Sequence, residues 1–137
     1  MSTKYKATEI TQTYFITMTT VGWIDIFTRL NQKYIIINAL KYCQENKGLT
    51  IFAYCLMHSH LHLLCRADAN ISLAEIMRDF KKYTSKKIIH TIIEEPESRR
   101  EWLLNYFKKT VNICLESKDI KYGKMVIMLK KFFQING

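Results

Sequence analysis

The spacing of hydrophobic residues changes along the chain and predicts alternating strands and helices. Residues 13–20 form a β-branched and aromatic run, Thr-Tyr-Phe-Ile-Thr-Met-Thr-Thr, which is typical of a strand. Over 31–48 hydrophobic residues recur at helical spacing, and the segment ends in a glycine suited to cap a helix. Two further apolar, β-prone runs, at 49–57 and 60–65, are separated by only two residues. They predict a β-hairpin.

The second half of the chain has mainly helical spacing. Ser72 and Glu75 stand in the capping-box arrangement, in which a hydroxyl and a carboxylate satisfy free backbone N–H groups where a helix begins. Apolar residues then follow at three- and four-residue steps and predict a long helix to about Ile93. Pro96 interrupts this pattern, which resumes over 97–111. The predicted order is therefore strand, helix, strand, strand, helix, helix.

Composition narrows the class of protein. A chain of 137 residues is the length of one domain, and its 48% hydrophobic content excludes intrinsic disorder. We expect no signal peptide, because no apolar stretch of about 7–15 residues follows the N-terminus. We also expect no membrane partner, because no run reaches the roughly 18 apolar residues of a membrane span. The four cysteines include no C-x-x-C pair, which favours free thiols in a reducing cytoplasm.

The net charge and one predicted helix both point to a polyanionic partner. The charge of +9 predicts attraction first to nucleic acid, then to an anionic membrane surface and to anionic metabolites. Basic residues form a stripe on the helix that begins after Ser72, beside Tyr83. Such a stripe with aromatic neighbours suits a single-stranded phosphate backbone with stacked bases, although an ordinary solvated helix face has the same pattern. The residues expected to bind DNA are Arg78, Lys81, Lys82 and Lys86.

Three of the four histidines lie in the run His58-Ser59-His60-Leu61-His62. In a strand, residues two apart share a face, so these imidazoles would be aligned. Two or three imidazoles on one face can bind a divalent metal, either zinc or a harder ion that positions a phosphate. The alternative is a row of surface histidines on a half-exposed strand. The H-E-x-x-H motif of zinc proteases is absent.

The histidine run and the basic helix together resemble a known family. Residues 53–64, Ala-Tyr-Cys-Leu-Met-His-Ser-His-Leu-His-Leu-Leu, and Phe-Lys-Lys-Tyr-Thr-Ser-Lys-Lys at 80–87 resemble the single-tyrosine HUH transposases, closest to the REP-associated tyrosine transposases. The motif of that family is Met-Pro-Asn/Ser-His-x-His-Leu. His60 and His62 match its metal pair, and His58 stands where the family has proline.

This resemblance implies a fold, a cofactor and a reaction. The fold is α+β, a ferredoxin-like antiparallel sheet backed by helices, often in a homodimer. His60 and His62 would hold Mg²⁺ or Mn²⁺ on a phosphate of single-stranded or hairpin DNA. A tyrosine of the family then attacks that phosphate to form a phosphotyrosine intermediate.

The C-terminal part of the sequence departs from the family pattern. Neither the strand motif Trp-Gln-Asp-Gly-Tyr-His nor the nucleophile motif Tyr-Ile-x-x-Asn-Pro is present. We therefore divide the chain into a family-like part, 1–111, and a non-family tail, 112–137, and expect the sheet to lack at least one strand. Tyr83, Tyr106 and Tyr122 do not match the nucleophile, so we expect an inactive transposase fragment. The alternative is a small basic metal- or nucleic-acid-binding module that never had nuclease activity.

A reading-frame change would explain the tail. With suitable codons, Lys124 to Leu129 contains Asp-Gly-Tyr-His-Ala in a shifted frame, and Lys121 to Gly123 supplies Val-Trp-Gln directly before it. We predict that the encoding DNA carries a one-base deletion near the codon for Asn112. Sequencing that region and the bases past the stop codon tests this prediction. It is wrong if no single-base shift restores Trp-Gln-Asp-Gly-Tyr-His.

Overall fold

The architecture is known from a computed structural model, which describes residues 12–116 and 127–135 and, within them, the side chains of residues 12–110. Short 3₁₀ turns follow the first strand at Val21–Trp23 and Ile26–Thr28. The strands and helices are, in chain order, β1 (Thr13–Thr20), α1 (Leu30–Asn46), β2 (Leu49–Leu56), β3 (His60–Ala67), α2 (Leu73–Glu94), α3 (Arg100–Glu116) and β4 (Ile127–Ile135).

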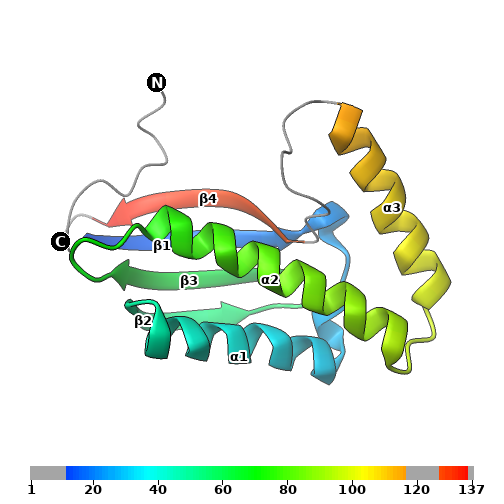
Figure 1. The fold of residues 1–137 in the computed structure, drawn as a ribbon, viewed down its shortest axis with the longest axis horizontal. Coiled ribbons are helices and arrows are strands. Elements are labelled where there is room, and N and C mark those ends of the chain that lie inside the picture. Colours follow the sequence, from blue (N-terminus) through cyan, green and yellow to red (C-terminus); the bar gives the residue numbers. More distant parts are fainter. Residues whose placement is uncertain (1–11, 117–126, 136–137) are drawn as a thin grey trace.

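The four strands form one antiparallel sheet in the order β2-β3-β1-β4. Helices α1 and α2 lie side by side over one face of this sheet, and α3 stands at the end where β1 ends and β3 begins (Figure 1). This strand order, with a helix after β1 and another after β3, is the ferredoxin-like arrangement. The predicted α+β fold, an antiparallel sheet backed by helices, is confirmed.

Residue alternation in β1 and β3 separates the two faces of the sheet. Leu61 and Leu63 in β3 are buried under the helices, while His60 and His62 point to the other face. In β1 the buried Ile16 and Met18 join the same core. Burial of these apolar side chains is the main favourable term in folding, and it fixes which face the histidines occupy.

Local signals in the sequence set the helix ends. The Ser72 hydroxyl accepts a hydrogen bond from the backbone N–H of Glu75 at 3.2 Å, as the capping box predicts. At the other end α2 stops at Glu94, two residues before Pro96, which disfavours helical backbone in the residue preceding it.

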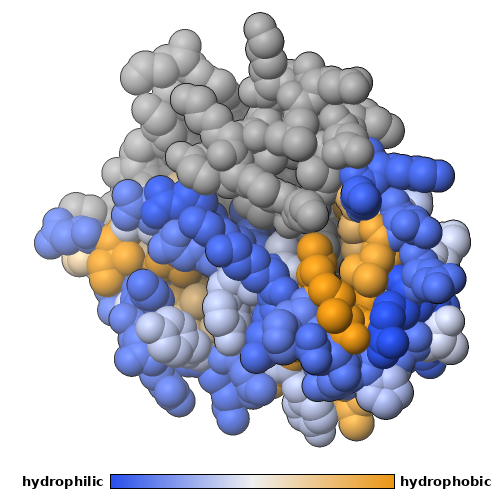
Figure 2. Space-filling view, turned by 45° about the vertical axis from the view of Figure 1, so that its right-hand side comes forward, coloured by the Kyte–Doolittle hydropathy of each residue, from blue (hydrophilic) through white to orange (hydrophobic). Residues whose placement is uncertain are grey.

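The face of the molecule shown in Figure 2 is mostly hydrophilic, with hydrophobic residues gathered in local groups.

Strand β4 corrects the expectation of an incomplete sheet. It pairs with β1 along the whole of that strand, from Thr13 opposite Ile135 to Thr20 opposite Ile127, with one register shift after Thr17. Without this pairing β1 would expose a row of unpaired backbone N–H and C=O groups. The segment 127–135 reads Ile-Met-Leu-Lys-Lys-Phe-Phe-Gln-Ile. Its β-branched and aromatic residues suit a strand, even if a frame change produced this sequence.

Other expectations about the chain meet the structure only in part. Helix α3 continues past the expected boundary at residue 111, and the assignment of 112–137 to another reading frame stays a prediction. None of the helices in the described ranges is long and apolar enough to cross a membrane. Cys43, Cys55 and Cys65 are free thiols, as expected.

Candidate functional site

His60 and His62 lie next to each other on the face of the sheet that α1 and α2 do not cover. Their ring centroids are 4.8 Å apart and their planes meet at 76°. Across the strand pair, Thr19 lies opposite His60 and Thr17 opposite His62. The structure thus brings together the two residues that match the metal pair of the HUH motif.

A hydroxyl group contacts the Nδ1 atom of each imidazole. Thr17 Oγ1 is 3.0 Å from His62 Nδ1, and Ser59 Oγ is 3.3 Å from His60 Nδ1. When each Nδ1–H donates to its hydroxyl, the lone pair of each ring is on Nε2. A partner that holds the second ring nitrogen in this way is the usual support of a metal-binding histidine. Two neighbouring imidazoles with hydroxyl partners are a set of groups that fits a divalent cation.

Thr19 adds an unsatisfied polar atom beside this pair. It is only 1% exposed, and within the described part of the chain its Oγ1 has no hydrogen-bond partner. Buried hydroxyls are normally paired, with protein or with water. Thr19 lies opposite His60, so this unpaired hydroxyl is on the strand that neighbours the histidine pair.

His58 does not continue the row. Strand β3 begins at His60, and His58 lies in the preceding bend with its side chain exposed. Strand alternation therefore does not place it beside the other two. No group of three or more His, Cys, Asp or Glu residues in the described ranges could hold a metal ion. The arrangement favours a site of two histidines over one of three.

Backbone hydrogen bonds tie the bend before His60 to the loop after β1. The Thr20 N–H donates to the Ser59 carbonyl at 2.8 Å, and the Phe27 N–H donates to the His58 carbonyl at 3.0 Å. Within the loop, the Thr20 hydroxyl donates to the Ile24 carbonyl at 2.7 Å. The loop and the histidine pair are therefore held as one unit.

An ion-pair network connects this loop to the start of α3. Arg99 Nη1 contacts Asp25 Oδ1 at 2.6 Å, and Arg99 and Arg29 each lie 3.4 Å from the Glu97 carboxylate. The hydrogen bond from Arg99 lowers the pKa of Asp25. Burial raises the pKa of Glu97, but hydrogen bonds from the Arg99 N–H and from Arg29, with their charges, outweigh it and hold this pKa below its usual value.

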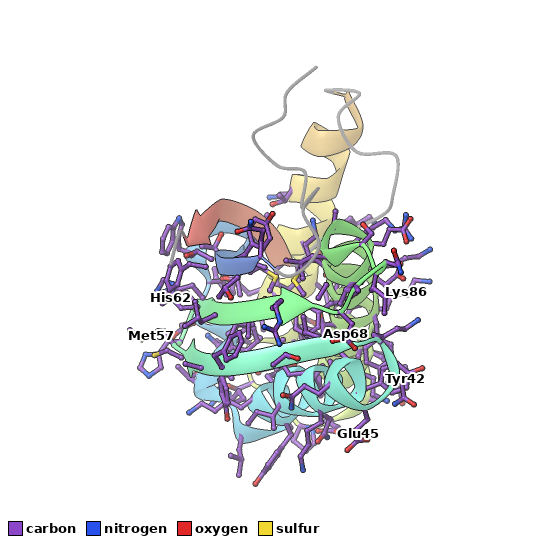
Figure 3. The ribbon with its side chains drawn as sticks, turned by 90° about the vertical axis from the view of Figure 1, so that its left-hand side faces the viewer. Tyr42, Glu45, Met57, His62, Asp68 and Lys86 are labelled. Carbon is purple, nitrogen blue, oxygen red and sulfur yellow. The ribbon has the colours of Figure 1, made fainter. Side chains whose placement is uncertain are left out.

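The basic residues expected to bind DNA lie away from the histidines. They belong to α2, on the helical side of the sheet, and Figure 3 shows Lys86 on one side of the strands with His62 on the other. Lys82 and Lys86 are exposed, while Arg78 is paired with Asp79 at 3.2 Å. Burial lowers the pKa of Lys81. The stripe and the histidine pair therefore do not form one continuous patch on a single chain.

The three tyrosines considered as candidate nucleophiles lie in different parts of the chain. Tyr83 is exposed on α2, across the sheet from the histidines. Tyr106 is partly buried on α3, and its hydroxyl packs so closely on Gly22 that a Cβ there would collide with it. Tyr122 lies outside the described residues.

Comparison with known proteins decides the family. The sequence model described as "Transposase IS200 like" matches residues 8–122, which is most of the chain. The chain belongs to the IS200-like transposase family. The fold agrees with the crystal structure of a Deinococcus radiodurans R1 protein assigned as a transposase, with a TM-score of 0.52 and 10% identity over 76% of this chain and 93% of that one. No curated protein sequence matches the chain.

Sequence reasoning located the histidine pair of this IS200-like chain but missed the residues that orient it. Thr17 lies 45 positions from His62, and only the pairing of β1 with β3 brings them together. Ser59 is adjacent to His60 in sequence, yet its contact depends on the bend before β3. One pattern in the sequence does indicate where the Thr17 side chain lies: in a strand over 13–20, Thr13, Thr17 and Thr19 share one face.

The Glu97 network predicts a particular loss of stability in acid. A carboxyl group whose pKa is lowered by folding binds fewer protons in the folded state than in the unfolded state. Its stabilising contribution is therefore present above the unfolded pKa of about 4 and is lost as pH falls through the folded pKa. We expect the free energy of unfolding of wild type to fall more steeply below about pH 4 than that of Glu97→Gln, as measured by urea denaturation.

The exposed Glu45→Gln on α1 serves as the matched control, because it removes the same charge outside the network. Parallel pH profiles for wild type and Glu97→Gln would contradict the prediction.

Proposed function

We propose that this chain binds single-stranded or hairpin DNA and that His60 and His62 hold Mg²⁺ or Mn²⁺ against a backbone phosphate. The observation that carries the proposal is the pair of adjacent imidazoles, each with Nδ1 against a hydroxyl. A divalent cation bound there would neutralise charge on the phosphate. Histidine and phosphate or water oxygens are ordinary ligands for Mn²⁺, while Mg²⁺ depends more on the oxygens.

Each residue of the site has a separate role in this proposal. The imidazoles supply the two nitrogen ligands, and the hydroxyls of Thr17 and Ser59 limit the rotation of the rings and accept from Nδ1–H. Because β3 is an inner strand, paired with β1 and β2, the two imidazoles are supported by a rigid element.

We further propose that the chain binds DNA without cleaving it. The Tyr-Ile-x-x-Asn-Pro motif is absent, Tyr83 faces away from the histidine pair, and the Tyr106 hydroxyl is packed on Gly22. A homodimer remains part of the proposal, since it could bring the basic α2 of one copy near the histidines of another. The proposed compartment is the cytoplasm, where transposase and DNA would meet.

The histidine pair is tested with a labelled DNA hairpin that carries a single-stranded tail. We expect Mn²⁺ to strengthen binding to wild type and to His58→Ala, and to have no effect on the His60→Ala, His62→Ala double variant, as measured by fluorescence anisotropy. Thr17→Val should weaken the Mn²⁺ dependence by about 10-fold or more, because it removes the partner of His62 Nδ1.

The same mixtures, run on a denaturing gel, test for cleavage. No covalent protein–DNA adduct is expected. An adduct that disappears in Tyr83→Phe or Tyr106→Phe would show that a nucleophile is present and would contradict the proposal of an inactive chain.

In the anisotropy measurement, equal loss of the Mn²⁺ effect in His58→Ala and in the His60→Ala, His62→Ala double variant would indicate a three-histidine site.

The basic stripe is tested through salt. Each phosphate contact with single-stranded DNA contributes about 0.7 to the slope of log K against log salt. If Lys82 and Lys86 both contact phosphates, the Lys82→Ala, Lys86→Ala double variant should lower that slope by about 1.4. Lys41→Ala, Lys47→Ala removes the same charge from exposed positions at and just after α1 and is the matched control. Equal slopes for the two double variants would contradict a specific role for the stripe.

A further inference from the structure

A tryptophan with an unusual backbone conformation lies beside the histidine pair. Trp23 is 60% exposed, and its ring centroid is 5.6 Å from that of His60, with the two planes at 66°. Its φ is 58°, in the left-handed region that residues with a Cβ rarely adopt. Sequence reasoning used this segment only to mark the end of a strand.

The surrounding structure holds this conformation in place. Gly22 also has a left-handed φ, 62°, and the Tyr106 hydroxyl packs against it. Before the tryptophan, the Thr20 N–H is bonded to the Ser59 carbonyl, and after it, the Phe27 N–H is bonded to the His58 carbonyl. Strained conformations that the rest of a fold enforces cluster at functional sites. The indole of Trp23 is thus held in solvent and forgoes the free energy that burial of its apolar surface would give.

Aromatic rings continue from Trp23 across the histidine pair. His60 and His62 are 4.8 Å apart, and Phe15 stacks on His62 at 5.5 Å with only 20° between the planes. The proposed phosphate site therefore lies inside a row of four rings, with Trp23 as its exposed end. Single-stranded DNA alternates phosphates with flat bases, and an aromatic side chain beside a phosphate site can stack on a base of any sequence.

We infer that Trp23 stacks on the nucleobase adjoining the phosphate held at His60 and His62, an inference that rests on the proposed function. Trp23 is a positioning residue in this scheme: it fixes the base, and so the register of the strand over the histidines. It takes no part in bond breaking. The alternative role, an anchor for the loop alone, would change stability without selecting any position in the DNA.

An abasic scan separates these two roles. A DNA hairpin with a single-stranded tail is made with one base removed at each tail position in turn, and its affinity is measured by anisotropy. For wild type, one position should lose about 10-fold in affinity when its base is removed, which is within the range for base–aromatic stacking. Trp23→Leu should bind the intact tail about 10-fold more weakly and show no further loss at that position.

Tyr42→Leu is the matched control, because Tyr42 is a similarly exposed aromatic residue on α1, across the sheet. It should keep the wild-type profile. The inference is overturned if Trp23→Leu retains the same position-dependent loss as wild type.

Fluorescence gives a second measurement that leaves Trp23 unchanged. The chain has two tryptophans, so Trp102→Phe makes Trp23 the single indole. Its emission should be quenched when the hairpin saturates the protein, and the abasic position should reduce that quenching. Unchanged emission in a complex that anisotropy shows to be formed would overturn this inference alone. Absence of any DNA binding by wild type would overturn the proposed function, and this inference with it.

Discussion

The register between β1 and β3 is the constraint on which the histidine pair depends. It sets Thr17 opposite His62 and Thr19 opposite His60, so the hydroxyl that contacts His62 Nδ1 belongs to a different strand. A slip of one residue would turn every side chain of β3 to the other face, which would bury the histidines and expose the leucines. The orientation of the imidazoles is therefore a consequence of how the sheet assembles.

Packing in the core fixes that register. Ile16 and Met18 pack with Leu61 and Leu63 under the helices, and a slipped strand would lose these contacts. Strand β4 pairs with β1 along the edge that β3 does not occupy and completes the ferredoxin-like sheet. The segment 127–135 thus has a structural role in this IS200-like chain, although it matches no motif of the family.

Local signals made much of this fold predictable. Strand 13–20, the hairpin strands on either side of His58-Ser59, and the capped start of α2 all follow from short-range patterns, and β3 alternation already placed His60 and His62 on one face. Long-range pairing was not predictable from one sequence. The contact of Thr17 with His62 and the pairing of β4 both join segments far apart in the chain. The sequence also does not show that the sheet separates Lys86 of α2 from His62 (Figure 3).

The ring nitrogens of His60 and His62 give the most direct test of this account. Long-range ¹H–¹⁵N NMR of the imidazoles reports which nitrogen carries the proton, and a titration with Mn²⁺ reports which ring approaches the metal. The account predicts that both histidines are protonated on Nδ1 and that Mn²⁺ in trace amounts broadens their signals more strongly than those of His58 and His90, both exposed. Protonation on Nε2 in both rings, or equal broadening of all four histidines, would contradict it.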